Sequence, residues 1–201
     1  MRLILVRHAR VELRNGIPAD QWQLSEAGRR DAASLARWEG WRGLRVIASS
    51  PEAKAVDTAR PIAAAAELEL VVEADLREAG RPSLPLVSRE RHVAQVAAYL
   101  RGEPLPGWED LQEVTRRVTT CIERLLATAS GDAAIVSHGL ALSLYLGSSF
   151  TEWERIPLPA VAVLDAATRR VIEPWTSIPD TRALVPEGGR RQARRESRSR
   201  Q

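Results

Sequence analysis

Arg7 and His8 are the first residues of the chain whose types could do chemistry together. They directly follow the apolar run of residues 3–6, which is typical of a buried parallel strand. In open α/β sheets, ligands bind just beyond the carboxyl ends of such strands. The sequence therefore predicts a permanent cation and an imidazole at an edge of a sheet where a ligand would bind.

Three further residues with useful chemistry also follow short apolar runs. Lys54 falls near the start of a predicted helix, Glu78 follows the third predicted strand, and His138 follows the fourth. In a parallel sheet, all these strand ends open on the same edge. We therefore expect Lys54, Glu78 and His138 to gather around Arg7 and His8.

This combination of side chains suits one reaction in particular. Two permanent cations, two imidazoles and the N-terminus of a helix are well suited to a dianionic phosphoryl group. A neutral imidazole, whose ordinary pKa is about 6.5, is a usable nucleophile near pH 7. A carboxyl group with a raised pKa can protonate the leaving oxygen. The set indicates phosphoryl transfer through a phosphohistidine.

The elements that must position these groups alternate between strands and helices. Apolar runs predict strands over residues 2–6, 46–48, 68–72 and 133–136 and a closing hairpin over 161–164 and 170–172. Amphipathic spacing and capping residues predict helices from Ser25 to about 36, from a serine cap at Ser49 or Ser50 and Pro51 to about 66, and over 88–101, 109–128 and 139–146.

Strands that alternate with helices predict an α/β fold: a three-layer α/β/α sandwich with a mostly parallel central sheet and a closing antiparallel strand. We expect a single domain over residues 1–187, with no internal repeat. Residues 188–201 hold six arginines and one glutamate and no apolar residue larger than alanine. Such a segment should not fold by itself.

Four short motifs occur in a fixed order along the chain: RH, SSPxxKAxxTA, LxE and SHG. Their order and separations resemble the histidine phosphatase superfamily, also called phosphoglycerate-mutase-like. The resemblance extends from about residue 2 to 165, and the stretch LSEAG at 24–28 is similar to the family's LTxxG helix start.

The resemblance implies a role for each matching residue. His8 corresponds to the phosphorylated nucleophile and Arg7 to a phosphate clamp beside it. Lys54 stands where the family usually has arginine. Glu78 corresponds to the proton donor, and His138 to the second histidine, which would stabilise the transferred phosphoryl group. No cofactor and no metal ion are implied.

The chain departs from the family's pattern near the nucleophile and at Lys54. It has RHA in place of the commonest opening RHG, which removes support for glycolytic mutase activity and is more similar to the phosphatase branches. Arg10 and Trp22 are candidates for the mouth of the substrate site. Lysine offers a point charge where arginine offers a planar fork. The chain has 28 arginines, and its single lysine falls on this motif, which favours a pocket role.

Other titratable residues have less specific signals. Glu73 and Asp75 compete with Glu78 for the role of proton donor. His92 is expected at the surface, and the lone Cys121 is expected to be buried and inert within a helix.

Composition limits the partners and the location of the chain. The pI of 9.7 comes largely from the terminal segment 188–201. This segment has a net charge of +5, whereas residues 1–187 have a net charge of −2, which together give the +3 of the whole chain. We therefore expect no nucleic-acid binding except through this segment. No apolar stretch is long enough for a membrane span or a signal peptide, so we expect a cytoplasmic protein that acts on a phosphorylated small molecule or a phosphoprotein.

The functional interpretation is a metal-independent phosphomonoester hydrolase of the histidine acid phosphatase type, and four alternatives remain open beside it. Two histidines and a carboxylate could instead hold a metal ion, although neighbouring cations would repel it. The chain could bind a phosphorylated ligand without catalysis. It could also be a phosphoglycerate-type mutase or a phosphatase of phosphohistidine proteins.

Overall fold

The computed structural model describes residues 1–82, 85 and 87–177 of the 201-residue chain. A six-stranded sheet in the order β3-β2-β4-β1-β5-β6 forms its centre. The strands are β1 (Arg2–Arg7), β2 (Leu44–Ser49), β3 (Leu70–Val72), β4 (Asp132–Ser137), β5 (Ala160–Asp165) and β6 (Val171–Thr176). β1 to β4 run parallel, and β5 and β6 close the sheet as an antiparallel pair.

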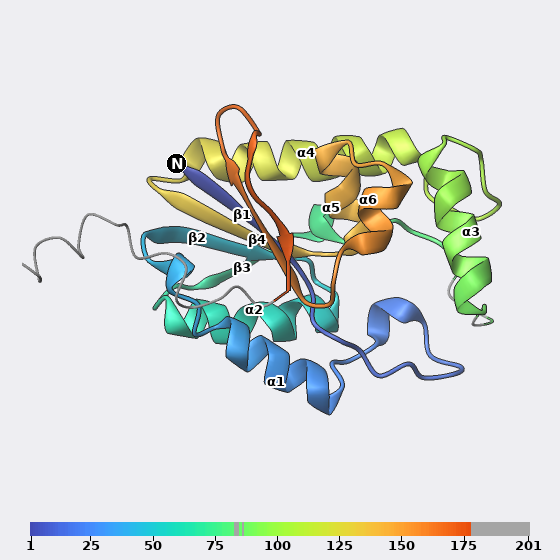
Figure 1. The fold of residues 1–201 in the computed structure, drawn as a ribbon, viewed down its shortest axis with the longest axis horizontal. Coiled ribbons are helices and arrows are strands. Elements are labelled where there is room, and N and C mark those ends of the chain that lie inside the picture. Colours follow the sequence, from blue (N-terminus) through green and yellow to red (C-terminus); the bar gives the residue numbers. More distant parts are fainter. Residues whose placement is uncertain (83–84, 86, 178–201) are drawn as a thin grey trace, which may run out of the picture.

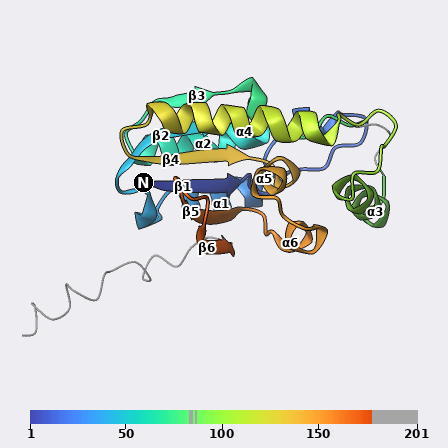
Figure 2. The same cartoon turned by 90° about the horizontal axis from the view of Figure 1, so that it is seen from above.

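Helices cover both faces of this sheet. They are α1 (Glu26–Leu35), α2 (Ala53–Ala65), α3 (Arg89–Leu100), α4 (Leu111–Thr128), α5 (Gly139–Leu146) and α6 (Phe150–Arg155). Figure 1 shows α4 along one face of the sheet and α1 with α2 along the other. Figure 2 shows α3, α5 and α6 at the end toward which β1 and β4 point. The predicted three-layer α/β fold with a closing antiparallel pair is confirmed.

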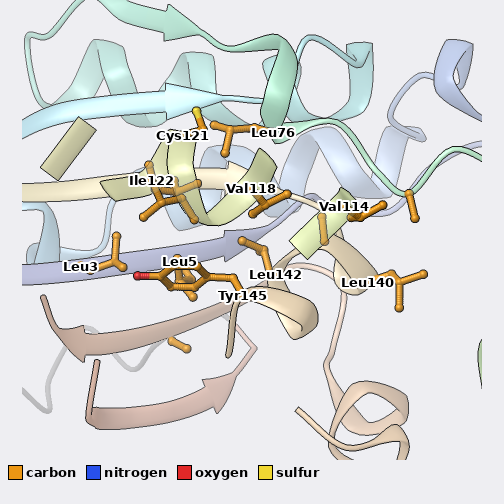
Figure 3. Packing of buried hydrophobic residues seen from close by; sticks show 14 of the residues in the cluster. Leu3, Leu5, Leu76, Val114, Val118, Cys121, Ile122, Leu140, Leu142 and Tyr145 are labelled. Atoms are coloured by element: carbon orange, nitrogen blue, oxygen red, sulfur yellow. The ribbon is translucent and has the colours of Figure 1, made fainter. Parts of the chain in front are cut away.

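The sheet separates two hydrophobic cores because successive side chains of a strand point to opposite faces. Leu3 and Leu5 of β1 pack with Val118 and Ile122 of α4 and with Leu142 of α5, as Figure 3 shows. Each fully buried side chain of this size contributes about 2 kcal/mol of transfer free energy. Burial on both faces explains why the central strands are continuously apolar rather than alternating.

The opposite core lies between the sheet and the helices α1 and α2. Ile4 and Val6 of β1 pack there with Leu35 of α1 and with Ile62 of α2. The predicted serine cap of α1 is present, because the Ser25 side chain accepts a hydrogen bond from the backbone N–H of Gly28. These contacts fix where the two helices begin relative to the carboxyl ends of the strands.

One local prediction was wrong, and one short helix was not predicted. The helix expected to start at Pro51 behind a serine cap starts at Ala53 instead, with Glu52 as its N-cap residue. Neither serine is its N-cap residue: the Ser49 hydroxyl donates to the Ser50 carbonyl, and the Ser50 hydroxyl accepts the backbone N–H of Glu52 over 3.2 Å and contacts His138. In addition, the sequence did not predict the short helix α6, whose Ser149 and Glu152 form a capping box.

Two further observations concern membrane-spanning helices and the C-terminal segment. Among the described residues, no helix has both the length and the apolar character that crossing a membrane requires. The arginine-rich segment 188–201 and the expected domain end at residue 187 lie outside the described residues.

Candidate active site

A cavity of about 560 Å³ opens at the carboxyl ends of β1, β2 and β4. It is lined by the five residues to which the sequence assigns a phosphoryl-transfer role: Arg7, His8, Lys54, Glu78 and His138. The parallel sheet brings these residues together from segments that lie far apart in the sequence. As the sequence predicts, all five residues lie at the same edge of the sheet.

Strand register places the two histidines beside each other. Arg7 of β1 is paired with Ser137 of β4, so the next residue of each chain segment, His8 and His138, leaves the sheet at the same level. Their ring centroids are 5.2 Å apart, and the backbone N–H of His8 donates to the Ser137 carbonyl over 3.0 Å. The pair is therefore positioned by backbone pairing.

His8 is buried and has a defined tautomer when neutral. Its Nδ1 lies 2.8 Å from the carbonyl oxygen of Ala9, which can only accept, so Nδ1 carries the proton and Nε2 keeps a lone pair. Burial lowers the pKa of His8 well below its ordinary 6.5, and the neighbouring His138, Lys54 and Arg7 lower it further. The ring is thus a neutral imidazole that could act as a nucleophile through Nε2.

His138 is fully buried and bonds through Nε2. This atom lies 2.7 Å from the Ser50 hydroxyl and 3.3 Å from Oε1 of Glu52. Because a carboxylate can only accept a hydrogen bond, Nε2 carries the proton of the neutral ring. Its Nδ1 is buried and has no hydrogen-bond partner within the described part of the chain. Burial lowers the pKa of His138 well below its ordinary value, and the positive charges of Lys54 and Arg81 lower this pKa further.

Arg7 brings a half-buried guanidinium to the cavity wall. Its Nη1 donates to the Ile156 carbonyl, and its Nε has no partner among residues 1–82, 85 and 87–177. Burial lowers the pKa of Arg7, the carboxylate of Glu78 raises it, and an arginine stays protonated in either case. The guanidinium lies against Gly139, where an added Cβ would be 3.0 Å from its Cζ. A side chain at residue 139 would therefore press against this guanidinium.

Lys54 lies in the cavity wall, but its ammonium already has a counter-ion. Its Nζ forms an ion pair with Oε2 of Glu52 and donates to the Ala19 carbonyl over 2.7 Å. The side chains of Lys54 and Glu52 are only 7% and 10% exposed. The second oxygen of Glu52 accepts the backbone N–H of Glu78 over 2.8 Å. Glu52 thus links the three predicted site residues Lys54, Glu78 and His138.

Glu78 points its carboxylate at the N-terminus of α5. The backbone N–H groups of Leu140 and Ala141 donate to it over 3.2 and 2.9 Å, and that of Ala79 over 3.0 Å. A helix N-terminus favours a carboxylate. Its two rivals for the donor role do not line the cavity: Glu73 pairs with Arg124, and Asp75 is exposed.

A buried arginine of α4 fixes the segment that carries Glu78. Arg117 donates to the carbonyl oxygens of Asp75, Arg77 and Glu78 over 2.7, 2.8 and 3.0 Å. The carboxylate of Glu109 accepts from the other side of the same guanidinium over 2.8 and 2.9 Å. The sequence places Arg117 in an amphipathic helix but does not indicate that its charge is buried.

The two candidates for the substrate mouth have different positions. Trp22 lines the cavity, and its Nε1 donates to the Ile17 carbonyl over 3.0 Å. Arg10 is not among the cavity-lining residues, because its guanidinium pairs with Asp31 of α1 at 2.8 Å. An added Cβ on Gly28 would lie 2.0 Å from the Arg10 carbonyl oxygen, so the backbone of Arg10 packs directly on α1.

Sequence reasoning missed several residues of the cavity wall. His92 was expected at the surface, but it is half-buried, lines the cavity and meets Trp153 edge-on, with ring centroids 6.1 Å apart. Burial lowers the pKa of His92 to about 4. The sequence does hold one indication that His92 faces inward: Val96, an apolar residue, lies one helical turn later on the same face of α3 and also lines the cavity. Glu52 was missed although it lies two residues before the single lysine.

The described residues contain no group of three or more His, Cys, Asp or Glu side chains placed to hold a metal ion. Within that part of the chain, the metal-hydrolase alternative therefore has no candidate ligand set.

Cys121 is buried as expected, and burial raises the pKa of its thiol to about 11.

The fold and the cavity together define an α/β domain with two adjacent histidines and a half-buried arginine at the carboxyl edge of its sheet. A profile of the histidine phosphatase superfamily (branch 1) matches residues 3–174. The chain belongs to this superfamily. A search of curated proteins gave no match.

Solved structures share this fold at low sequence identity. A mycobacterial glucosyl-3-phosphoglycerate phosphatase in complex with VO3 is 20% identical, with a TM-score of 0.68 over 89% of this chain and 99% of that one. A mutant phosphoserine phosphatase from Entamoeba histolytica in complex with phosphoserine is 19% identical, with a TM-score of 0.68 over 92% and 99%. YhfR from Bacillus stearothermophilus is 18% identical, with a TM-score of 0.68 over 90% and 98%.

Proposed function

We propose that this chain hydrolyses a phosphomonoester through a phosphohistidine intermediate on His8. Membership of the histidine phosphatase superfamily supports phosphatase activity in general. One observation carries the finer proposal: His8 is a neutral imidazole whose Nδ1–H is bound to the Ala9 carbonyl, which leaves Nε2 as the nucleophile. Arg7 and His138 line the cavity beside it, and the Arg7 guanidinium, whose Nε has no partner in the described part of the chain, can donate to the phosphoryl oxygens.

The proposed reaction has two displacements. In the first, Nε2 of His8 attacks phosphorus, the bond from phosphorus to the leaving oxygen breaks, and Glu78 in its protonated form gives that oxygen a proton. In the second, water attacks phosphorus and the N–P bond breaks, while the Glu78 carboxylate takes the proton from water. Inorganic phosphate then leaves, and both His8 and Glu78 return to their starting states.

We propose that the substrate is a phosphorylated small molecule or a phosphoprotein. The glucosyl-3-phosphoglycerate and phosphoserine phosphatases that share the fold are consistent with small phosphomonoesters. A phosphohistidine protein would bring a P–N bond to the same nucleophile. A mutase would transfer the phosphoryl group of His8 to a second hydroxyl instead of to water.

One observation favours a second candidate function, a phospho-ligand-binding protein with weak or no catalysis. The ammonium of Lys54, which takes the place of the family's usual arginine, is already paired with Glu52. Such a pocket would bind the phosphoryl group less strongly than one with an unpaired cation. Both functions use the same cavity and differ in whether His8 becomes phosphorylated.

A trapping experiment separates these functions. Wild-type protein and the His8→Ala variant are mixed with a panel of phosphomonoesters, quenched in alkali and assayed for protein-bound phosphate. The hydrolase should carry phosphate that is stable in base and labile in acid, and the variant should carry none. Ligand binding without any phosphoprotein would identify the binding function, and equal hydrolysis by both proteins would exclude His8 as the nucleophile.

The proposed chemistry uses no metal ion, so hydrolysis should be unchanged after exhaustive treatment with EDTA. Loss of activity that returns on addition of a divalent cation would instead favour the metal-hydrolase alternative.

A further inference from the structure

Glu52 is a carboxylate inside the cavity that is proposed to bind a phosphate dianion. It lines the cavity wall, its side chain is 10% exposed, and its two oxygens contact Lys54 on one side and His138 on the other. No role in the proposed reaction requires it. A buried negative charge at this position opposes the binding of a second one.

We propose that Glu52 sets the affinity of this cavity for phosphate by competing with the ligand for the ammonium of Lys54. The inference rests on the proposed function, because it takes the cavity as the phosphate site. It adds an affinity-determining residue to the two histidines and Arg7.

The competition follows from the donors that Lys54 can offer. An ammonium has three N–H groups, and here one pairs with Oε2 of Glu52 and one donates to the Ala19 carbonyl. A phosphate that approaches this ammonium meets a charge that Glu52 has already neutralised. Part of the binding free energy is then used to weaken the ion pair between Lys54 and Glu52.

The position of Glu52 in the fold makes this competition persistent. Glu52 is the N-cap residue of α2, so it lies only two residues before Lys54 at the start of the helix. Its Oε1 is held by the backbone N–H of Glu78 over 2.8 Å. The carboxylate therefore has a second anchor that keeps it in the cavity when Lys54 turns toward a ligand.

Removal of the charge should reverse the effect. In Glu52→Gln, Lys54 becomes a buried ammonium without a counter-ion, which destabilises the unliganded protein. Phosphate would then supply the missing counter-ion. We expect inorganic phosphate to bind at least tenfold more tightly to this variant, which corresponds to about 1.4 kcal/mol, and to raise its melting temperature more than that of the wild type.

The test is a double-mutant cycle on the dissociation constant of inorganic phosphate, measured by calorimetry for wild type, Glu52→Gln, Lys54→Ala and the double variant. Glu123→Gln is the matched control, because Glu123 also pairs with a cation but lies on α4 outside the cavity lining. If Glu52→Gln does not fold, Glu52→Asp, whose shorter side chain weakens the contact with Lys54, should shift the affinity in the same direction.

Tighter binding in Glu52→Gln that disappears in the Lys54→Ala background supports the proposal. Unchanged or weaker binding, or equal tightening in both backgrounds, overturns it. Trapping of phosphate on His8 is measured on the same wild-type sample. A trapped phosphoenzyme together with no effect of Glu52→Gln rejects this inference alone, whereas absence of both phosphate binding and phosphoenzyme rejects the proposed function and the inference with it.

Discussion

At the scale of single residues, Lys54 shows how one cation can be both buried and engaged. We expect Lys54→Ala to lower kcat/KM by about tenfold or more, because a hydrogen bond from a charged group contributes about 1.5–3 kcal/mol. The variant also leaves Glu52 in the cavity without a counter-ion, which adds to the loss. Steady-state kinetics with the best substrate of the panel provide the measurement.

The control for this substitution lies on the same helix. Arg60 of α2 is exposed and pairs with Asp57. Arg60→Ala should therefore keep the kinetics of the wild type. Unchanged kinetics in Lys54→Ala would remove this lysine from the site.

Sequence reasoning at this scale succeeded where a residue directly follows a strand. Arg7, His8 and His138 could be placed in one cavity because parallel register fixes the residues at the strand ends. Glu52 and His92 could not, because their positions depend on where α2 begins and how α3 packs. Both depend on tertiary contacts, which local sequence patterns do not specify.

At the scale of elements, the segment that carries Glu78 depends on α4. Arg117→Met should lower the free energy of unfolding by about 3 kcal/mol, because it leaves three carbonyl groups without their donor and removes the buried cation from Glu109, which keeps only the half-buried Arg77 as an ionic partner. It should also lower kcat more than it raises KM, since Glu78 loses its support while Arg7 does not. Urea denaturation and kinetics measure the two effects.

The neighbouring residue offers a matched control. Arg116 lies on the exposed face of α4 and pairs with Glu113. Pairs of this kind contribute less than about 1 kcal/mol, so Arg116→Met should be nearly neutral. If Arg117→Met were equally neutral in stability and in kcat, the segment would have to be held by other contacts.

The start of α2 shows why boundaries are harder to predict than elements. Pro51 after two serines is typical of a helix start, yet the helix begins at Ala53. The Ser50 hydroxyl accepts the backbone N–H of Glu52 over 3.2 Å and also contacts His138 over 2.7 Å. The local hydrogen bond that the sequence suggests is thus present, but the helix begins after it.

At the scale of the whole molecule, the chain should lose stability in mild acid. The folded state lowers the pKa values of His8, His92 and His138, that of His92 to about 4. The unfolded chain takes up protons on these rings below about pH 6.5, whereas the folded chain does so only at lower pH. The free energy of unfolding should therefore fall as the pH drops below about 6.5, by up to about 1.4 kcal/mol per pH unit for each histidine.

Urea denaturation at several pH values between 7.5 and 4.5 measures this slope. His92→Gln should reduce it, because one of the three titrating rings is then missing. A free energy of unfolding that stays constant or rises between pH 6.5 and 4.5 would contradict the predicted direction.

The fold as a whole was predictable because its strands are short, apolar and separated by amphipathic helices. The alternation implied a parallel sheet, and the two apolar runs near the end of the described chain implied the antiparallel pair β5 and β6. The sequence did not reveal the strand order β3-β2-β4-β1-β5-β6. That order depends on crossovers and on packing between helices, which no local pattern specifies.

The central position of β1 has a consequence for the order of events during synthesis. β1 is made first among the strands, yet its two neighbours are β4 and β5, which end at residues 137 and 165. Until β4 has been made, β1 lacks both partners and His8 has no His138 beside it, and β1 keeps one unpaired edge until β5 has been made. More than 130 residues must therefore be synthesised before native pairing of β1 can start, and its apolar side chains stay exposed during that time.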